Sequence, residues 1–163
     1  MQHSRVVIWR HGRTAWNAEL RWQGQSDIPL DSVGLEQARL AAVKLADYSP
    51  SRIIASDLIR AVNTAQFLSD VVDVPVEIDT RLRETNGGMW EGMTQSDIRR
   101  DHSEYLQSWL NDATLPAGIN GETRDEVAER VAAAIVEHAS TTAGTLVVAT
   151  HGGAARVAIL RLL

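Results

Sequence analysis

Two histidines stand where runs of apolar residues end, and glycine follows each of them. His11 comes after residues 6–10 (Val-Val-Ile-Trp-Arg), and His151 comes after residues 146–150 (Leu-Val-Val-Ala-Thr). Such runs predict central strands of an α/β sheet, and sheets of this kind build their sites outside the carboxyl ends of the strands. Both side chains are therefore predicted at one edge of a sheet, where a histidine can act as a nucleophile.

Two arginines and a glutamate are predicted at the same edge. Arg10 precedes the first histidine, and Arg60 lies in the first turn of a helix after the strand-like residues 52–56. Its side chain should lean back toward the strand end. Glu84 follows another strand-like run at residues 75–78. Each residue alone has an ordinary structural explanation, but five such groups at one edge, with glycines beside both histidines, favour a functional site.

The residue types suit phosphoryl transfer. A phosphomonoester carries nearly two negative charges, and its transfer is catalysed mainly by positioning and by charge stabilisation. Arg10 and Arg60 offer permanently charged, forked donors, whereas the chain's single lysine, Lys44, lies in a helical pattern. A protonated His151 would add a third positive charge, and the amides after it would open a helix as an anion site.

Covalent catalysis would need a neutral His11 and a proton shuttle. Only an unprotonated ring nitrogen can form the bond to phosphorus. Glu84 is expected to protonate the leaving alkoxide and then, once ionised, to activate the water that hydrolyses phosphohistidine. One carboxyl would thus serve both half-reactions.

Residues 10–17 (Arg-His-Gly-Arg-Thr-Ala-Trp-Asn) resemble the R-H-G-x-T-x-x-N signature of the histidine phosphatase superfamily, the phosphoglycerate mutase-like group. Further matches follow in the family's order over nearly the whole chain: Gln23-Gly24, Leu30 to Gly34, Ser56 with Arg60, Thr64-Ala65, residues 82–84 and 88–92, Gly121-Glu122-Thr123 and residues 151–153. The resemblance implies a phosphohistidine at His11, a phosphate surrounded by Arg10, Arg60 and His151, and Glu84 as proton donor. It also implies phosphate or substrate contacts by Asn17, Gln23, Gly24 and Gly152.

The composition fits one globular domain over residues 1–163, with 44% hydrophobic residues and no low-complexity tract. A net charge of −5 gives no general attraction for nucleic acid. The absence of cysteine excludes disulfides and thiol chemistry. No run is long enough to span a membrane, and residues 1–4 do not begin a signal peptide, so we expect a cytoplasmic enzyme whose partner is a small phosphorylated metabolite.

The order of elements predicts a three-layer α/β/α sandwich with a mostly parallel central sheet. Three amphipathic helices should cover it. They are a helix capped by Ser32 with Leu35, Ala38, Ala42 and Leu45 on one face, a helix capped by Ser56 or Asp57 with Leu58, Val62, Ala65 and Leu68, and a helix opened by a Thr123–Glu126 capping box with Val127, Val131, Ala134 and Ile135.

A helical insertion at about residues 90–121 is expected to determine the substrate, because it lies between Glu84 and the second histidine. Residues 94–111 read as helical and residues 115–121 as a loop. The large side chains of the insertion line a pocket or pack on the core; packing is favoured for most, and Trp90 is the most ambiguous. The insertion is shorter than in cofactor-dependent mutases and lacks their arginine-rich segment. This difference favours a phosphatase for sugar or glycerate phosphates over a phosphoglycerate mutase, which would need 2,3-bisphosphoglycerate; otherwise no cofactor is expected.

The C-terminal end departs from the family pattern. Family members usually continue through a further helix and a closing strand, whereas this chain ends at Leu163 after a mostly apolar stretch. Either the chain is truncated, or its last helix packs on the core or on a second subunit, which would make a homodimer.

Two other classes of function stay open. A metal ion could be held by His11, His151 and Glu84, but the arginines would crowd a cation with positive charge, so no metal is expected. The domain could also bind phosphorylated ligands without turnover. Glu84, which binding alone does not require, favours an enzyme. The remaining histidines are expected to be structural: His3, His102 and His138.

Overall fold

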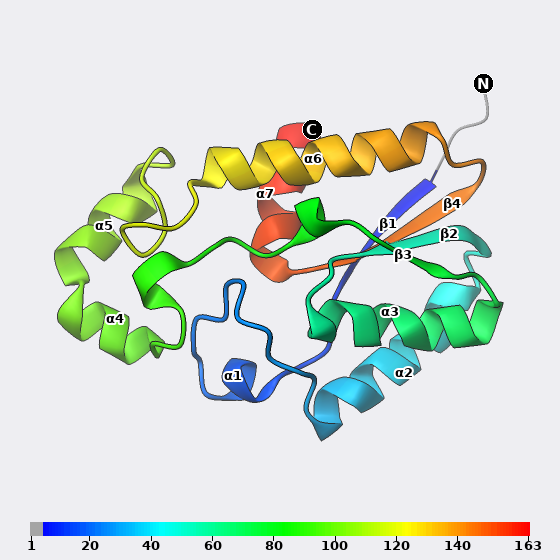
Figure 1. Cartoon of the computed structure of the whole chain (residues 1–163), viewed down its shortest axis with the longest axis horizontal. Helices are drawn as coiled ribbons and strands as arrows, with labels where there is room; N and C mark the ends of the chain where they lie inside the picture. Colours follow the sequence, from blue (N-terminus) through cyan, green and yellow to red (C-terminus); the bar gives the residue numbers. More distant parts are fainter. Residues whose placement is uncertain (1–4) are drawn as a thin grey trace.

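The computed structural model describes residues 5–163, so His3 and the expectation drawn from residues 1–4 lie outside the described residues. A sheet runs through the molecule with helices above and below it (Figure 1). The elements follow in this order: β1 (Arg5–Arg10), α1 (Ala15–Ala18), α2 (Ser32–Ala46), β2 (Pro50–Ala55), α3 (Ile59–Val72), β3 (Val76–Ile78), the 3₁₀ turns η1 (Thr80–Leu82) and η2 (Gly88–Trp90), α4 (Gln95–Asp101), α5 (Ser103–Asn111), α6 (Arg124–Ser140), β4 (Thr145–Thr150) and α7 (Gly152–Leu162).

The sheet has four strands in the order β1-β4-β2-β3, and every neighbouring pair is parallel. The predicted parallel sheet is therefore confirmed. Because parallel strands point the same way, the residues that follow them meet at one edge. His11 follows β1, Ser56 follows β2 and His151 follows β4.

The two faces of the sheet have separate cores, which confirms the three-layer sandwich. Successive residues of β4 alternate between them, as the period of two in a strand requires. Leu146 and Val148 join one core with buried side chains of α6 and α7. Val147 and Ala149 join the other, with side chains of α2 and α3. Every residue of β4 is buried, as expected for a central parallel strand.

The start of α3 differs from the prediction. Its N-cap is Leu58, not Ser56 or Asp57. The carboxylate of Asp27, which lies in a distant loop, accepts a hydrogen bond from the backbone N–H of Ile59 at 2.7 Å. A capping acceptor from another part of the chain satisfies a free N–H as well as a local one does. Ser56 is consequently available to the histidine after β4.

Helix α2 also begins differently. Asp31, one residue before the predicted Ser32, caps it by accepting a hydrogen bond from the N–H of Gly34 at 2.8 Å. Ala38 and Ala42 are buried as predicted, but Leu35 is 42% exposed and was wrongly placed on the buried face. The capping box of α6 is confirmed, and all four of its predicted core residues are buried: Val127, Val131, Ala134 and Ile135.

The insertion forms two short helices, α4 and α5, at the left end of the molecule in Figure 1. His102, between them, ends one helix and begins the next. Trp90 is fully buried in a third, smaller core with Ile98 and Ala117, against which Trp22 and Trp109 pack. Trp90 is therefore a core residue and not a residue of the pocket wall.

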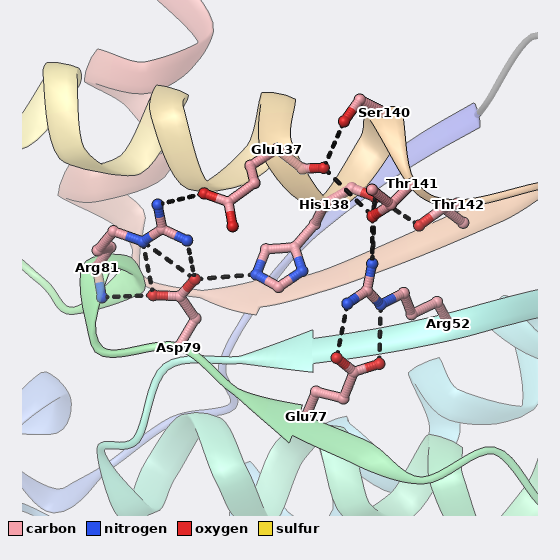
Figure 2. Close-up of polar contacts among 9 residues, drawn as sticks. All are labelled: Arg52, Glu77, Asp79, Arg81, Glu137, His138, Ser140, Thr141 and Thr142. Carbon is pink, nitrogen blue, oxygen red and sulfur yellow. Dashed lines mark hydrogen bonds and ion pairs between the residues drawn. The ribbon is translucent and has the colours of Figure 1, made fainter.

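A polar network joins β2, β3 and α6 (Figure 2). Asp79 follows β3, accepts hydrogen bonds from the Arg81 side chain and contacts His138 at 2.9 Å. The hydrogen bonds from Arg81 are the main reason why the pKa of Asp79 lies far below its usual value, and His138 adds to the effect. Arg52 pairs with Glu77 in the same network. His138 thus has a structural role in this network.

Helix α7 packs on the core through small residues. Ala154 and Ala158 are fully buried beside α6 and the sheet, whereas Leu160 is 69% exposed. No helix within residues 5–163 is long and apolar enough to cross a membrane.

Candidate active site

His11 is buried, with 8% exposed surface, directly after β1. Its Nδ1 lies 2.7 Å from the carbonyl oxygen of Gly12. A carbonyl only accepts, so Nδ1 carries the hydrogen and Nε2 keeps a free lone pair. The pKa of His11 is lowered to about 4, mainly by burial and in smaller part by the charges of Arg60 and Arg10, against the opposing hydrogen bond to Gly12. The ring is therefore neutral at pH 7, as a nucleophile requires.

Gly12 allows the loop after β1 to lie against α2 and α3. A Cβ at this position would stand 2.3 Å from the carbonyl oxygen of Gly34. The N–H of Gly12 donates to Oγ1 of Thr64 at 3.1 Å. The first histidine is thus placed by a close backbone contact that only glycine permits.

His151 is fully buried after β4, and the centroid of its ring lies 5.1 Å from that of His11. Its Nε2 lies 2.8 Å from Oγ of Ser56, and that oxygen already accepts the N–H of Leu58 at 3.3 Å. The hydroxyl hydrogen of Ser56 can donate to Nε2 in the tautomer that carries the ring hydrogen on Nδ1. Nδ1 is buried and has no hydrogen-bond partner among residues 5–163.

The sequence left the charge of His151 open. Burial, followed by the positive charge of Arg60, holds its pKa well below 6.5. The ring is therefore neutral at pH 7 and does not add a third positive charge to the site.

Arg60 is fully buried in the first turn of α3, as predicted. Its Nη1 donates to the carbonyl of Ser26 and its Nη2 to the carbonyl of Gly24, both at 2.7 Å. Nε is buried and, within residues 5–163, has no partner. One N–H of each terminal nitrogen thus binds the backbone of a loop, and Nε is the nitrogen that has no partner at all.

Glu84 is held by three backbone N–H groups. Its carboxylate accepts from Thr85 at 2.8 Å, from Gly153 at 2.9 Å and from Ala154 at 2.8 Å. The last two belong to the first turn of α7, where free N–H groups attract an anion. The sequence predicted that the amides of Gly152 and Gly153 form an anion site for the ligand; in the structure the carboxylate of Glu84 binds the amide of Gly153 and the next one, of Ala154.

A cavity of about 240 Å³ opens beside the first histidine and is lined by Arg10, His11, Arg13, Asn17 and Gln37. Three of the predicted site residues thus line it. The other six lie outside its lining: Arg60, His151, Glu84, Gln23, Gly24 and Gly152. Gln23 is buried and accepts the hydroxyl of Thr14 at 2.8 Å, and Gly152 begins α7 beside the Arg10 side chain.

The sequence profile of the histidine phosphatase superfamily (branch 1) matches residues 6–163. The chain belongs to this superfamily. It is 46% identical over 131 residues to the glucosyl-3-phosphoglycerate phosphatase of Mycolicibacterium vanbaalenii, covering 80% of this chain and 57% of that protein. It is 35% identical over 130 residues to the probable phosphoglycerate mutase GpmB of Yersinia pestis, covering 80% of this chain and 60% of that one. The matches thus span under two thirds of these curated relatives.

Solved structures of the superfamily share the fold. The mycobacterial glucosyl-3-phosphoglycerate phosphatase in complex with VO3 superposes with a TM-score of 0.91 at 36% identity, over 98% of this chain and 81% of that chain. The putative alpha-ribazole-5'-P phosphatase of Escherichia coli superposes with a TM-score of 0.86 at 29% identity, over 98% of this chain and 79% of that chain.

Several polar residues that support this histidine phosphatase site were not predicted to do so. Ser56 was interpreted as a helix cap, and Glu122 was noted only as part of a family motif. Glu91 accepts the N–H of Gln25 at 2.9 Å and the hydroxyl of Ser26 at 2.8 Å, and so holds the loop that binds Arg60. Their signal in the sequence is membership of matched motifs. The partners of Glu91 and Ser56 lie 65 to 95 positions away, beyond what spacing reveals.

Proposed function

We propose that this chain hydrolyses phosphomonoesters through a phosphohistidine at His11, acting on a small metabolite of the sugar phosphate or glycerate phosphate type. Four buried side-chain nitrogens have no hydrogen-bond partner within the described residues, and two of them belong to Trp90 and Trp109 in the core of the insertion. The observation that carries the proposal is that the other two, Nε of Arg60 and Nδ1 of His151, belong to the predicted site. Buried donors are rarely left without acceptors in native proteins. A phosphoryl group beside Nε2 of His11 would supply oxygens for both.

The relatives support the same substrate class. The mycobacterial glucosyl-3-phosphoglycerate phosphatase has been solved with VO3 and with inorganic phosphate. Its fold covers nearly the whole of this chain. A small phosphorylated sugar or glycerate derivative is therefore the class of metabolite to test first.

In the first half-reaction, Nε2 of His11 forms a bond to phosphorus as the bond from phosphorus to the leaving oxygen breaks. Glu84 gives its proton to that oxygen. Arg60, Arg10 and the N–H of His151 hold the equatorial oxygens, whose charge they stabilise throughout. In the second half-reaction the ionised Glu84 takes a proton from water, the water oxygen attacks phosphorus, and the bond from phosphorus to Nε2 breaks.

The remaining predicted residues would shape the phosphate site. Asn17 lines the cavity, while Gln23 and Gly24 belong to the loop whose carbonyls hold Arg60. Gly152 has room for the Arg10 side chain beside it. The cavity also reaches Arg13 and Gln37, so the leaving group would extend toward these two side chains.

A phosphatase is favoured over a mutase because the relatives named as phosphatases are the more similar, at 46% identity against 35%. A mutase would depend on 2,3-bisphosphoglycerate, and no cofactor is part of the proposal. No group of three metal-ligating side chains occurs among residues 5–163. A chelator is therefore expected to leave the rate unchanged.

The proposal is tested with radiolabelled glycerol phosphate and 3-phosphoglycerate, each with and without chelator, under rapid acid-free quench. Wild-type protein should release inorganic phosphate and carry label on His11. His11→Ala should carry none and lose nearly all activity, whereas the control His102→Ala should keep both. Label transferred to a second glycerate would indicate a mutase. If the protein binds phosphate but neither carries label nor turns over substrate, it is a phosphate-binding domain and the proposed enzymatic activity is refuted.

A further inference from the structure

Glu84 lies in a stretch of irregular backbone between η1 and η2. No helix or strand fixes its position, yet a proton shuttle must stand within hydrogen-bond reach of the leaving oxygen and of the attacking water. The amides of Thr85, Gly153 and Ala154 hold the carboxylate itself. The backbone of Glu84 needs a separate support.

Arg130 of α6 provides that support. Its Nη1 donates to the carbonyls of Arg81 and Arg83 at 2.8 and 2.7 Å, and its Nη2 donates to the carbonyl of Glu84 at 3.0 Å. Nε and Nη2 also donate to the two carboxylate oxygens of Glu122, both at 2.8 Å. Since a guanidinium has five N–H donors, these contacts use its full capacity.

Glu122 holds the same segment from the other side. Its Oε2 accepts the backbone N–H of Asn86 at 2.8 Å, and the two residues also bond through their backbones at 2.9 Å. Burial raises the pKa of Glu122, but the hydrogen bonds from Arg130 and Asn86 outweigh it and leave the pKa below its usual value. Glu122 is therefore ionised at pH 7 and keeps the guanidinium oriented.

We propose that the Arg130–Glu122 pair is a positioning device for Glu84, which fixes the backbone on both sides of the proton shuttle. Neither residue lines the cavity, and the hydrogen bond that joins Arg130 to the site goes to the backbone of Glu84. After burial and Arg60, the charge of Arg130 also contributes to the lowered pKa of His151. The pair acts through Glu84, and the inference rests on the proposed function. Helix α6 carries Arg130 and packs on α7, whose first turn binds the Glu84 carboxylate, so backbone and carboxylate are held by two adjoining helices.

Two substrates separate this role from a merely structural one. An alkyl phosphate such as glycerol phosphate needs a proton on its leaving oxygen, whereas p-nitrophenyl phosphate does not. Displacement of Glu84 should therefore slow the first half-reaction for the alkyl substrate alone. Hydrolysis of phosphohistidine should slow for both.

The variants are Arg130→Met, Arg130→Lys and Glu122→Gln. With glycerol phosphate, Arg130→Met should lose kcat on the order of a hundredfold, the effect of misplacing a catalytic group by about 1 Å, with KM little changed. With p-nitrophenyl phosphate it should release a burst of nitrophenol at the wild-type rate and then turn over slowly. Arg130→Lys should not rescue kcat, because an ammonium cannot reach three carbonyls and a carboxylate.

The control is Arg52→Met. Arg52 also pairs with a carboxylate, Glu77, and donates to Thr141, but these partners belong to neither the site nor the Glu84 segment (Figure 2). The Arg52→Met variant should keep the wild-type kcat on both substrates. If Arg130→Met does not fold, Glu122→Gln leaves Arg130 in place and should show the same substrate dependence with a smaller loss.

Equal losses on the two substrates without a burst, or no loss in a folded variant, would overturn the positioning role. In either case an active wild-type enzyme with label on His11 would leave the proposed function standing. If the wild-type protein forms no phosphohistidine, the proposed function is contradicted, and so is the role of the Arg130–Glu122 pair.

Discussion

At the scale of single residues, the chemistry depends on which nitrogen carries a hydrogen, and neighbours make that choice. The carbonyl of Gly12 keeps the hydrogen of His11 on Nδ1, so Nε2 has the free lone pair that the proposed nucleophile needs. In His151 it is Nε2 that contacts a neighbour, the hydroxyl of Ser56, and Nδ1 has no partner among residues 5–163. Different neighbours thus leave a different ring nitrogen open in each histidine.

Arg60→Lys is expected to lose activity, even though the charge is kept. The guanidinium binds two loop carbonyls and still has Nε for a phosphate oxygen, whereas a lysine has one nitrogen on a flexible stem. The rate of His11 phosphorylation should fall on the order of a hundredfold, as for removal of one preorganised oxyanion donor. Pre-steady-state labelling measures it, with Arg39→Lys, an exposed change on α2, as the control. Wild-type labelling in Arg60→Lys would show that Nε does not bind phosphate.

At the scale of elements, strands and core-facing helices were predictable because their signal is local. The apolar run before His151 and the spacing of Val127, Val131 and Ala134 each reveal a buried face without knowledge of the partner. The cap of α3 was not predictable. Asp27 reaches Ile59 across 32 positions, and no local pattern announces such a contact.

The start of α7 shows the same limit at the site. A helix opened by two glycines after a histidine predicts an anion site, and a carboxyl group lies there. That this group belongs to Glu84, 69 positions earlier, depends on the path of the chain between them. The place of these residues at one edge of the sheet was therefore accessible from sequence, but the partner of the amides was not.

Gly153→Ala is expected to separate activity from stability. An added Cβ would stand 2.6 Å from Oε1 of Glu84, so the carboxylate must move. Alanine is preferred over glycine within a helix by roughly 0.5–1 kcal/mol, so the melting temperature should not fall. Turnover of glycerol phosphate should drop about tenfold or more.

The matched control for Gly153→Ala is Arg156→Ala, an exposed change on the same helix, which should keep full turnover. Melting is followed by circular dichroism and turnover by release of phosphate. A variant that keeps wild-type turnover of the alkyl substrate would show that the position of the carboxylate at α7 is not needed for catalysis.

At the scale of the whole molecule, the insertion is stabilised by a core of its own. Trp90, Trp22 and Trp109 pack together there, with ring centroids 5.3–5.7 Å apart. The sequence shows the aromatic residues but not whether they line a pocket, because both uses need the same side chains. Selection of the substrate by residues 90–121 stays a prediction, as do the cytoplasmic location and the homodimer.

The folded protein should become less stable as the pH falls from 7 to 5, because it buries two neutral histidines. The pKa of His11 is lowered to about 4 and that of His151 is also lowered, whereas both are near 6.5 in the unfolded chain. Between these values the unfolded state binds more protons, so the free energy of unfolding falls with falling pH. At about 1.4 kcal/mol per pH unit below 6.5, His11 alone contributes roughly 2 kcal/mol by pH 5.

Urea unfolding at pH 7, 6 and 5, in buffer free of phosphate, measures this loss of free energy of unfolding. These pH values lie above the range in which ordinary carboxylates titrate, so the histidines dominate the change. His11→Gln removes one of the two groups, so its free energy of unfolding should decline less steeply than that of the wild type, by roughly 2 kcal/mol over the same interval. Because a single neutral ring accounts for that difference, parallel declines in the two proteins would mean that His11 is protonated in the folded state well above pH 4. The nucleophile would then not be ready for attack at neutral pH without a ligand.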